Sequence, residues 1–164
     1  MAKVEVGKKV PAFRGEATGG APVASKDLKG QKYVLFFYPR ANTPGCTIES
    51  KDFRDLHGEF RRRKVRILGI SRDTQKAQEK FKQKFGFPFE LIADPDEEIC
   101  SLFDVMRDKN MYGRKVRGIE RSTFLVDESG VLRREWRKVN VKGHAREVLE
   151  SLEDPASRRP GQGT

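Results

Sequence analysis

The sequence predicts a single α/β domain with a central mixed β-sheet flanked by helices. Two observations support this prediction. Apolar runs of strand length alternate with amphipathic stretches of helix length, and a turn signal between two further apolar runs follows them. A length of 164 residues suits one domain with its own core. We therefore expect one domain at residues 1–152 and a disordered polar tail at residues 153–164.

A buried strand and a long helix are expected on either side of a short loop. Residues 33–38 (YVLFFY) are a continuous apolar run, typical of a central strand that is buried on both faces. An amphipathic stretch begins after Thr43-Pro44-Gly45 and continues to about Arg63. Four apolar side chains of this helix are expected to face the core: Ile48, Phe53, Leu56 and Phe60.

Two further strands and two further helices are expected in the middle of the chain. Residues 65–70 and 89–92 are short apolar runs of strand length. Between them, residues 74–85 are expected to form a helix with a threonine cap at its start and a glycine stop after its end. The segment Asp94-Pro95-Asp96-Glu97 has the residue types of a helix start, with the first aspartate as N-cap.

The last part of the chain predicts a β-hairpin and a final helix. Residues 122–126 and 131–137 flank the turn signal DESG, and residues 144–152 are amphipathic. In the parallel part of such a sheet, functional groups gather where strands end and helices begin. Cys46 lies at such a junction.

The composition favours a soluble protein with free thiols. Charged residues make up 35% of the chain, and no run approaches the ~20 apolar residues of a membrane span. The N-terminal segment lacks the apolar run of a secretory signal. With only two cysteines, Cys46 and Cys100, the sequence favours the reducing cytoplasm. We find no motif for a cofactor or a metal ion.

A net charge of +10 leaves two interpretations open. A solvated basic surface is favoured, because the basic residues are spread along the chain; binding to nucleic acid or anionic surfaces is the alternative. The densest basic run, residues 61–64, ends a predicted helix, where cations suit the helix dipole. No RNA-binding aromatic signature, zinc finger or basic zipper accompanies the charge. We therefore expect no membrane partner and no specific nucleic-acid partner.

Cys46 is the residue best placed for chemistry. The thiolate is the nucleophile, and an unperturbed cysteine with a pKa of about 8.5 is mostly protonated at neutral pH. Cys46 lies in the first turn of the predicted helix, where unpaired N–H groups favour an anion. Pro44 and Gly45 leave the backbone open to a small ligand, and the Thr43 hydroxyl can donate to the thiolate or the substrate. The alternative is a buried, inert cysteine, and spacing alone leaves both open.

A resemblance to a known family bears on this choice. Residues 38–47 (YPRANTPGCT) resemble the peroxiredoxin active-site signature, Pro-x-x-x-Thr-x-x-Cys. In detail they look like the bacterioferritin-comigratory, or PrxQ-type, subfamily. Further segments resemble that subfamily in the same order along the chain: residues 6–13, 17–20, 52–55 and 118–127.

The resemblance implies a thioredoxin-like fold with an N-terminal β-hairpin extension. It also implies reduction of hydrogen peroxide and organic hydroperoxides in antioxidant defence, through a sulfenic acid on Cys46. By position, Thr43 binds the peroxide, Pro39 shields the pocket, and Arg121 stabilises the thiolate and polarises the oxygen–oxygen bond. Glu49 matches a glutamate of the family.

Several of these residues also have simpler interpretations. Arg121 can be interpreted as a surface arginine or as part of a salt bridge. Glu49 can be interpreted as a glutamate that stabilises the first turn of a helix. His57 and His144 are the two histidines, and neither forms a metal-ligand pair. We expect both histidines to lie on the surface.

The sequence departs from the subfamily at the second, resolving cysteine. Many members carry it five residues after the first, where this chain has Lys51; others carry it on the following helix, where residues 74–85 contain none. Cys100 remains, beside apolar helix residues, so a partly buried cysteine with a structural role is favoured over a resolving one. We therefore expect a one-Cys mechanism completed by an external thiol, either thioredoxin, glutaredoxin or a low-molecular-weight thiol. The resemblance suggests a monomer or a weak dimer.

Two other functions remain as alternatives. One is a basic binding or chaperone-like protein on a redox-inactive scaffold, which the joint presence of Cys46, Thr43 and Arg121 disfavours. The other is a nucleic-acid accessory protein, whose mark would be steep salt dependence of binding to DNA or RNA.

Overall fold

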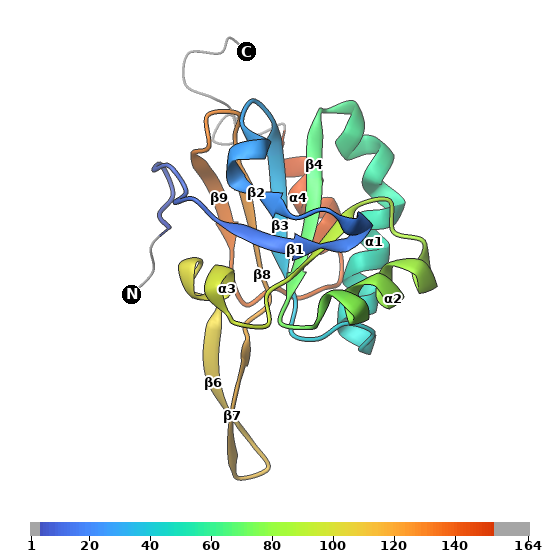
Figure 1. Cartoon of the computed structure of the whole chain (residues 1–164), viewed down its shortest axis with the longest axis vertical. Coiled ribbons are helices and arrows are strands. Elements are labelled where there is room, and N and C mark those ends of the chain that lie inside the picture. Colours follow the sequence, from blue (N-terminus) through green and yellow to red (C-terminus); the bar gives the residue numbers. More distant parts are fainter. Residues whose placement is uncertain (1–3, 153–164) are drawn as a thin grey trace.

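A central mixed β-sheet organises the computed structural model, which describes residues 4–152 (Figure 1). The tail expected at residues 153–164 lies outside the described residues. The strand order is β2-β1-β5-β4-β3-β8-β9. The bounds of these strands are β1 (Arg14–Ala17), β2 (Val23–Ala24), β3 (Lys32–Phe37), β4 (Val65–Ser71), β5 (Glu90–Ala93), β8 (Ser122–Val126) and β9 (Leu132–Trp136).

The middle of the sheet is parallel and its edges are antiparallel. Strand β4 pairs in parallel with β3 and β5, whereas β8, β9, β1 and β2 join antiparallel. The β1–β2 pair is the N-terminal hairpin that the resemblance implied. Residues 6–13, which resembled a first strand region, form only an isolated bridge between Lys9 and Val131. The mixed sheet predicted from the sequence is confirmed.

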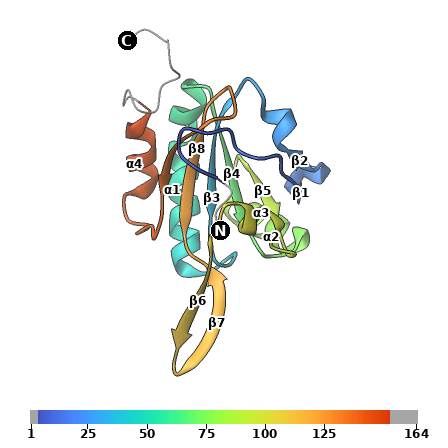
Figure 2. The same cartoon turned by 90° about the vertical axis from the view of Figure 1, so that its left-hand side faces the viewer.

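Helices cover both faces of this sheet. Their bounds are α1 (Pro44–Arg62), α2 (Gln75–Phe85), α3 (Glu98–Leu102) and α4 (His144–Ser151), with short 3-10 turns at η1 (Thr18–Gly20) and η2 (Ser25–Leu28). Side chains of α1, α2 and α4 pack into one apolar cluster, and those of α3 pack into another. Figure 2 shows α1 and α4 on one side of the sheet and α3 on the other.

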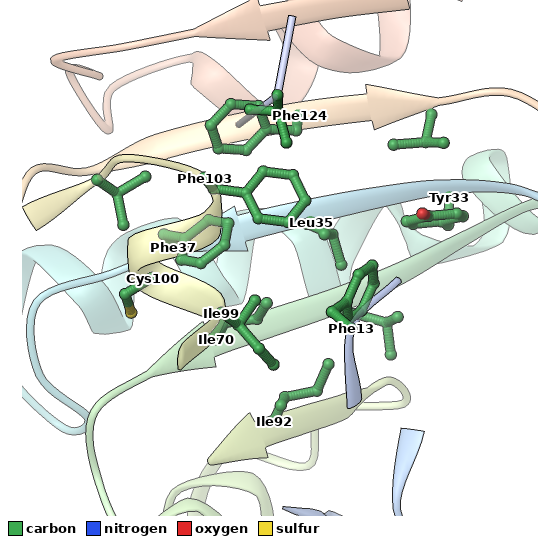
Figure 3. Packing of buried hydrophobic residues seen from close by; sticks show 14 of the residues in the cluster. Phe13, Tyr33, Leu35, Phe37, Ile70, Ile92, Ile99, Cys100, Phe103 and Phe124 are labelled. Carbon is green, nitrogen blue, oxygen red and sulfur yellow. The ribbon is translucent and has the colours of Figure 1, made fainter. Parts of the chain in front are cut away.

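Strand β3 separates the two clusters, because its side chains alternate between the faces. Leu35 and Phe37 belong to the cluster with Cys100, whereas Phe36 belongs to the cluster with Cys46. Figure 3 shows the first cluster, in which the Phe103 ring lies between those of Phe37 and Phe124 and Cys100 lies at one end. The two cysteines therefore lie on opposite faces of the sheet.

Helix α1 begins and ends where the sequence predicts. Phe53 and Phe60 are fully buried, and Leu56 packs partly against the same cluster. The expectation for Ile48 is wrong, because half of its surface is exposed (50%). Ile48 follows Cys46 by two positions and therefore points to the opposite side, about 200° around the helix axis.

The two middle helices differ in how well the sequence predicts them. For α2, the Thr74 hydroxyl accepts the N–H of Ala77 at 3.2 Å, and Gly86 ends the helix with a φ of 66°. Helix α3 begins only at Glu98, because the residues after Asp94 first form a turn. Asp94 still caps it from a distance, since its carboxylate accepts the N–H groups of Ile99 at 3.1 Å and Cys100 at 2.7 Å.

One β-hairpin was not predicted from the sequence. Strands β6 (Met106–Met111) and β7 (Arg114–Ile119) form a separate two-stranded antiparallel sheet. In Figures 1 and 2 it projects from the end of the domain at which α1 begins. Its sequence lacks the alternation of apolar and polar residues that marks a strand packed on a core.

Candidate active site

Cys46 lies in the first turn of α1, at the carboxyl end of the central strand β3. Thr43 is the extended N-cap residue, and Pro44 occupies the first helical position, where a missing N–H costs nothing. The Cys46 side chain is fully buried (0% exposed). The first turn of a helix favours a negative charge, because its N–H groups lack helical partners. The local structure is thus suited to a thiolate.

Arg121 brings a positive charge to this sulfur from across the sheet. It lies immediately before β8, and its Nη2 donates to the Cys46 Sγ at 3.4 Å. Its Nη1 donates to the Glu49 Oε1 at 2.8 Å, so one planar guanidinium contacts two helix residues. A side chain at Gly45 would place its Cβ 3.1 Å from Arg121 Nη2, so glycine keeps the approach open.

Glu49 is the buried partner of this arginine. Burial raises the pKa of Glu49 to about 7, although the charge of Arg121 acts in the opposite direction. Glu49 Oε2 is buried and has no hydrogen-bond partner among the described residues. Desolvation lowers the pKa of Arg121, but Glu49 and Cys46 outweigh that effect and raise it. The guanidinium therefore stays charged at any working pH.

Thr43 and Pro39 lie in the loop that leads to α1, yet neither side chain contacts the sulfur through a hydrogen bond among the described residues. The Thr43 hydroxyl donates to the carbonyl oxygen of Arg40 at 2.9 Å. Its oxygen retains lone pairs, and the hydroxyl can rotate toward a ligand. Pro39 is half-buried and directly follows Tyr38, at the end of β3. The structure therefore joins Cys46, Arg121 and Glu49 in one cluster, and it places Thr43 and Pro39 in the loop between β3 and α1.

A cavity of about 510 Å³ lies beside this loop. Arg40 and Asn42 line it from the loop, and Lys80 and Lys84 line it from α2. Lys84 Nζ also donates to the Asn42 Oδ1 at 3.2 Å, which ties the two elements together. Arg40, Lys80 and Lys84 thus give this cavity an excess of positive charge over the one carboxylate that lines it, Asp73.

His144 was expected on the surface, and this expectation is wrong. Its ring is buried (2% exposed), with Nε2 2.8 Å from Thr123 Oγ1 and Nδ1 3.1 Å from Glu147 Oε1. Burial lowers the pKa of His144, so the neutral ring is favoured. The spacing to the apolar residue Val148 was the missed signal, because a residue four positions later lies on the same helix face. His57 is half-buried against Phe89 rather than fully exposed.

Cys100 is also fully buried, whereas a partly buried side chain was expected, and its charged neighbours have the opposite sign. Burial raises the pKa of Cys100 far above the ordinary value, and the Asp94 carboxylate raises it further. A thiol in this environment stays protonated and unreactive. Within residues 4–152, no group of three His, Cys, Asp or Glu side chains is placed to hold a metal ion.

The fold and this cluster define a thioredoxin-fold enzyme that works through a cysteine. The AhpC/TSA family model matches residues 6–135. Peroxiredoxin Bcp of Bacillus subtilis is 43% identical over 155 residues, which cover 94% of this chain and 99% of that protein. Peroxiredoxin Bcp of Xanthomonas campestris is 46% identical over 141 residues, which cover 86% of this chain and 88% of that protein.

Solved structures agree. Peroxiredoxin Q of Xanthomonas campestris superposes with a TM-score of 0.83 at 45% identity, covering 88% of this chain and 91% of that one. A cysteine-to-serine mutant of Xylella fastidiosa PrxQ gives a TM-score of 0.88 at 37% identity, covering 93% and 98%. The chain belongs to the AhpC/TSA family, as a thiol-dependent peroxidase of the Bcp, or PrxQ, type. No helix among residues 4–152 has the length and apolar character needed to cross a membrane.

Proposed function

We propose that this peroxidase reduces hydrogen peroxide and organic hydroperoxides through Cys46, with Arg121 as the residue that activates it. The observation that carries the proposal is the 3.4 Å contact between Arg121 Nη2 and the Cys46 Sγ at the start of α1. A permanent cation and a helix N-terminus both stabilise negative charge at this position. The bacterioferritin comigratory protein of Xanthomonas campestris, a relative of solved structure, has alkyl peroxide reduction activity, which supports the substrate class.

The reaction is a displacement at oxygen. The Cys46 thiolate forms a sulfur–oxygen bond with the near peroxide oxygen, and the oxygen–oxygen bond breaks. The departing hydroxide or alkoxide takes up a proton, leaving a sulfenic acid on Cys46 and releasing water or an alcohol. Negative charge grows on the departing oxygen, so fixed donors stabilise the transition state. Arg121 provides such donors, Glu49 positions Arg121, the Thr43 hydroxyl turns to bind the peroxide, and Pro39 keeps water from the pocket.

An external thiol completes the cycle in this proposal. One thiol attacks the sulfenic acid to give a mixed disulfide and water, and a second thiol releases Cys46 and leaves as a disulfide. Two observations support this route over an internal one. Residues 74–85 and position 51 contain no cysteine. Cys100 lies on the other face of the sheet, so a bridge to Cys46 would require extensive unfolding.

The reducing cytoplasm is the proposed place of action, because a free Cys46 is needed at the start of each cycle. The reductant is a thioredoxin, a glutaredoxin or a low-molecular-weight thiol, acting on a monomer or weak dimer in antioxidant defence. Bcp and PrxQ relatives support the thiol-dependent cycle.

The test is consumption of hydrogen peroxide and cumene hydroperoxide with dithiothreitol as the reductant. Wild-type protein is expected to turn over many times. Cys46→Ser should abolish turnover while keeping the fold, since a serine hydroxyl at neutral pH is a far poorer nucleophile. More than trace turnover by Cys46→Ser, with a far-ultraviolet circular dichroism spectrum like that of wild type, would overturn the proposal.

A further inference from the structure

The β6–β7 hairpin, residues 106–119, has no role in the chemistry at Cys46; we call it the arm. At its base, Met106 and Ile119 are buried in the core cluster around Phe103. Beyond that base, β6 and β7 pair only with each other. Figures 1 and 2 show the arm projecting alone from the domain. A two-stranded ribbon without a core of its own gains little stability, so its retention calls for another explanation.

Charge on the arm is balanced at its base and unbalanced toward its tip. Near the base, Arg107 pairs with Asp104 at 3.3 Å, and Arg117 pairs with Glu97 at 3.0 Å. Farther out, the exposed cations Lys109, Arg114 and Lys115 have no ion pair among the described residues. The acidic residue of these strands, Asp108, lies opposite Arg117 near the base. All the charged residues in the outer half of the arm are therefore cations.

An exposed aromatic side chain occupies the tip. Tyr112 is fully exposed (100%) and has a left-handed backbone with a φ of 52°. Together with Gly113, at a φ of 78°, it forms the two-residue turn. A tyrosine in this conformation is uncommon, since asparagine or glycine fits it better. Tyrosine is enriched where proteins meet, because its ring gives apolar contact and its hydroxyl a hydrogen bond.

The arm is joined directly to the segment that contacts Cys46. Its second strand ends at Ile119, and Arg121, which contacts the Cys46 sulfur, follows two positions later. The arm therefore leaves the domain at the end of the sheet where α1 begins (Figure 1). Six residues of strand extend about 20 Å. The arm is therefore long enough to contact a macromolecule close to the active-site end of the sheet.

We propose that the arm is a docking surface for an acidic protein that carries the reducing dithiol. The proposal rests on the function proposed above, since the partner acts on oxidised Cys46. The argument is charge complementarity: Lys109, Arg114 and Lys115 are exposed cations on the arm, and the cysteine loop has the further cations Arg40 and Lys84 around its own cavity. A protein of net charge +10 attracts an acidic partner over a distance, and the unpaired cations orient it.

The test compares two triple variants with the same change of charge. The arm variant combines Lys109→Glu, Arg114→Glu and Lys115→Glu. The control combines Lys9→Glu, Lys26→Glu and Lys29→Glu, which are exposed around a cavity at the opposite end of β3. Both are assayed with an acidic thioredoxin, thioredoxin reductase and NADPH, and separately with dithiothreitol.

We expect the arm variant to lose tenfold or more of kcat/KM for the acidic thioredoxin at low salt, a typical size for electrostatic steering. The control should lose far less. At about 0.5 M NaCl, which screens the charges, the kcat/KM values of wild type and both variants should become similar. Tyr112→Ser should also raise KM for thioredoxin. With dithiothreitol, all variants should match wild type, which shows that the active site is intact.

Three results would overturn the docking proposal. The arm variant and the control could lose the same activity, which would make the effect one of net charge. Both variants could keep wild-type activity with thioredoxin, which would show that the arm charges have no role. The arm variant could keep its thioredoxin kinetics but lose salt-sensitive binding to a 20-base-pair DNA duplex, which would assign the arm to nucleic acid. Absence of dithiothreitol turnover in wild type would instead contradict the peroxidase function itself.

Discussion

Cys46 and Cys100 are equally buried and lie in opposite electrostatic surroundings. Cys46 stands at the start of a 19-residue helix and accepts a hydrogen bond from Arg121. Cys100 stands in a five-residue helix whose first N–H groups are already bound by the Asp94 carboxylate. One cysteine has free donors and a cation, whereas the other has occupied donors and an anion. Burial alone therefore does not decide whether a cysteine is reactive.

The comparison also explains why the sheet matters to the chemistry. The side chains of β3 point alternately to the Cys46 face and the Cys100 face, so the strand separates the two thiols. A sulfenic acid on Cys46 is then out of reach of the second cysteine in the folded state. This separation supports the proposed reduction by an external thiol.

Replacing Arg121, the cation beside Cys46, is expected to have the largest effect, because it removes the main electrostatic difference between the two cysteines. Arg121→Met is expected to slow the attack of Cys46 on hydrogen peroxide by about 100- to 1,000-fold, the usual cost of losing one fixed donor at a developing charge. Single-turnover stopped-flow fluorescence measures this rate. Arg121→Lys keeps the charge but not the planar fork, so it should fall between wild type and Arg121→Met. Equal rates in all three proteins would show that Arg121 does not contribute to the attack on peroxide.

Glu49 should give the next largest effect, in the dependence of stability on pH. Burial raises its pKa from 4.5 to about 7, so the native state keeps a proton that the unfolded chain has already lost above pH 4.5. The contribution of Glu49 to the free energy of unfolding is therefore complete below pH 4.5 and is lost as the pH rises to about 7. Each unit of pKa difference is worth about 1.4 kcal/mol, so the change from 4.5 to about 7 corresponds to a loss of roughly 3 to 4 kcal/mol.

Urea unfolding at several pH values tests this prediction. Between pH 4.5 and 7, wild-type stability should fall more steeply than that of Glu49→Gln, which cannot titrate at this position. Parallel curves for the two proteins would show that Glu49 is not held in the environment described here.

Cys100 should give the smallest effect on catalysis. We expect Cys100→Ser to keep its multiple turnovers with dithiothreitol, because the thiol lies on the other face of the sheet and stays protonated. In the native wild-type protein, iodoacetamide should modify Cys46 and spare Cys100, with peptide mass spectrometry as the measurement. A single turnover followed by arrest in Cys100→Ser would show that Cys100 resolves the sulfenic acid.

Much of the fold could be predicted from the sequence, where a local pattern reflects a local cause. The apolar run at residues 33–38 predicts strand β3. The threonine cap and the glycine stop predict the two ends of α2. The arm could not be predicted in this way, because beyond its buried base its strands contain cations on both faces and pair only with each other. Helix α3 began late because Asp94 caps it across an intervening turn.

The candidate site shows the same division. The position of Cys46 at the start of a helix follows from Pro44 and the strand before it. The pairing of Arg121 with Glu49 joins residues 72 positions apart, and periodicity carries no information about such a contact. Only the family resemblance indicated both residues. His144 was missed because its polar flanks hid the apolar helix face that it shares with Val148.

The most direct test of a one-Cys mechanism is a map of the cysteines after one equivalent of hydrogen peroxide. Wild-type protein is treated in the presence of dimedone, digested without reduction, and analysed by mass spectrometry. We predict a dimedone adduct on Cys46, an unmodified Cys100, and over-oxidation of Cys46 to the sulfinic acid when peroxide exceeds thiol. A disulfide between Cys46 and Cys100, with dimedone trapping only in Cys100→Ser, would contradict that mechanism.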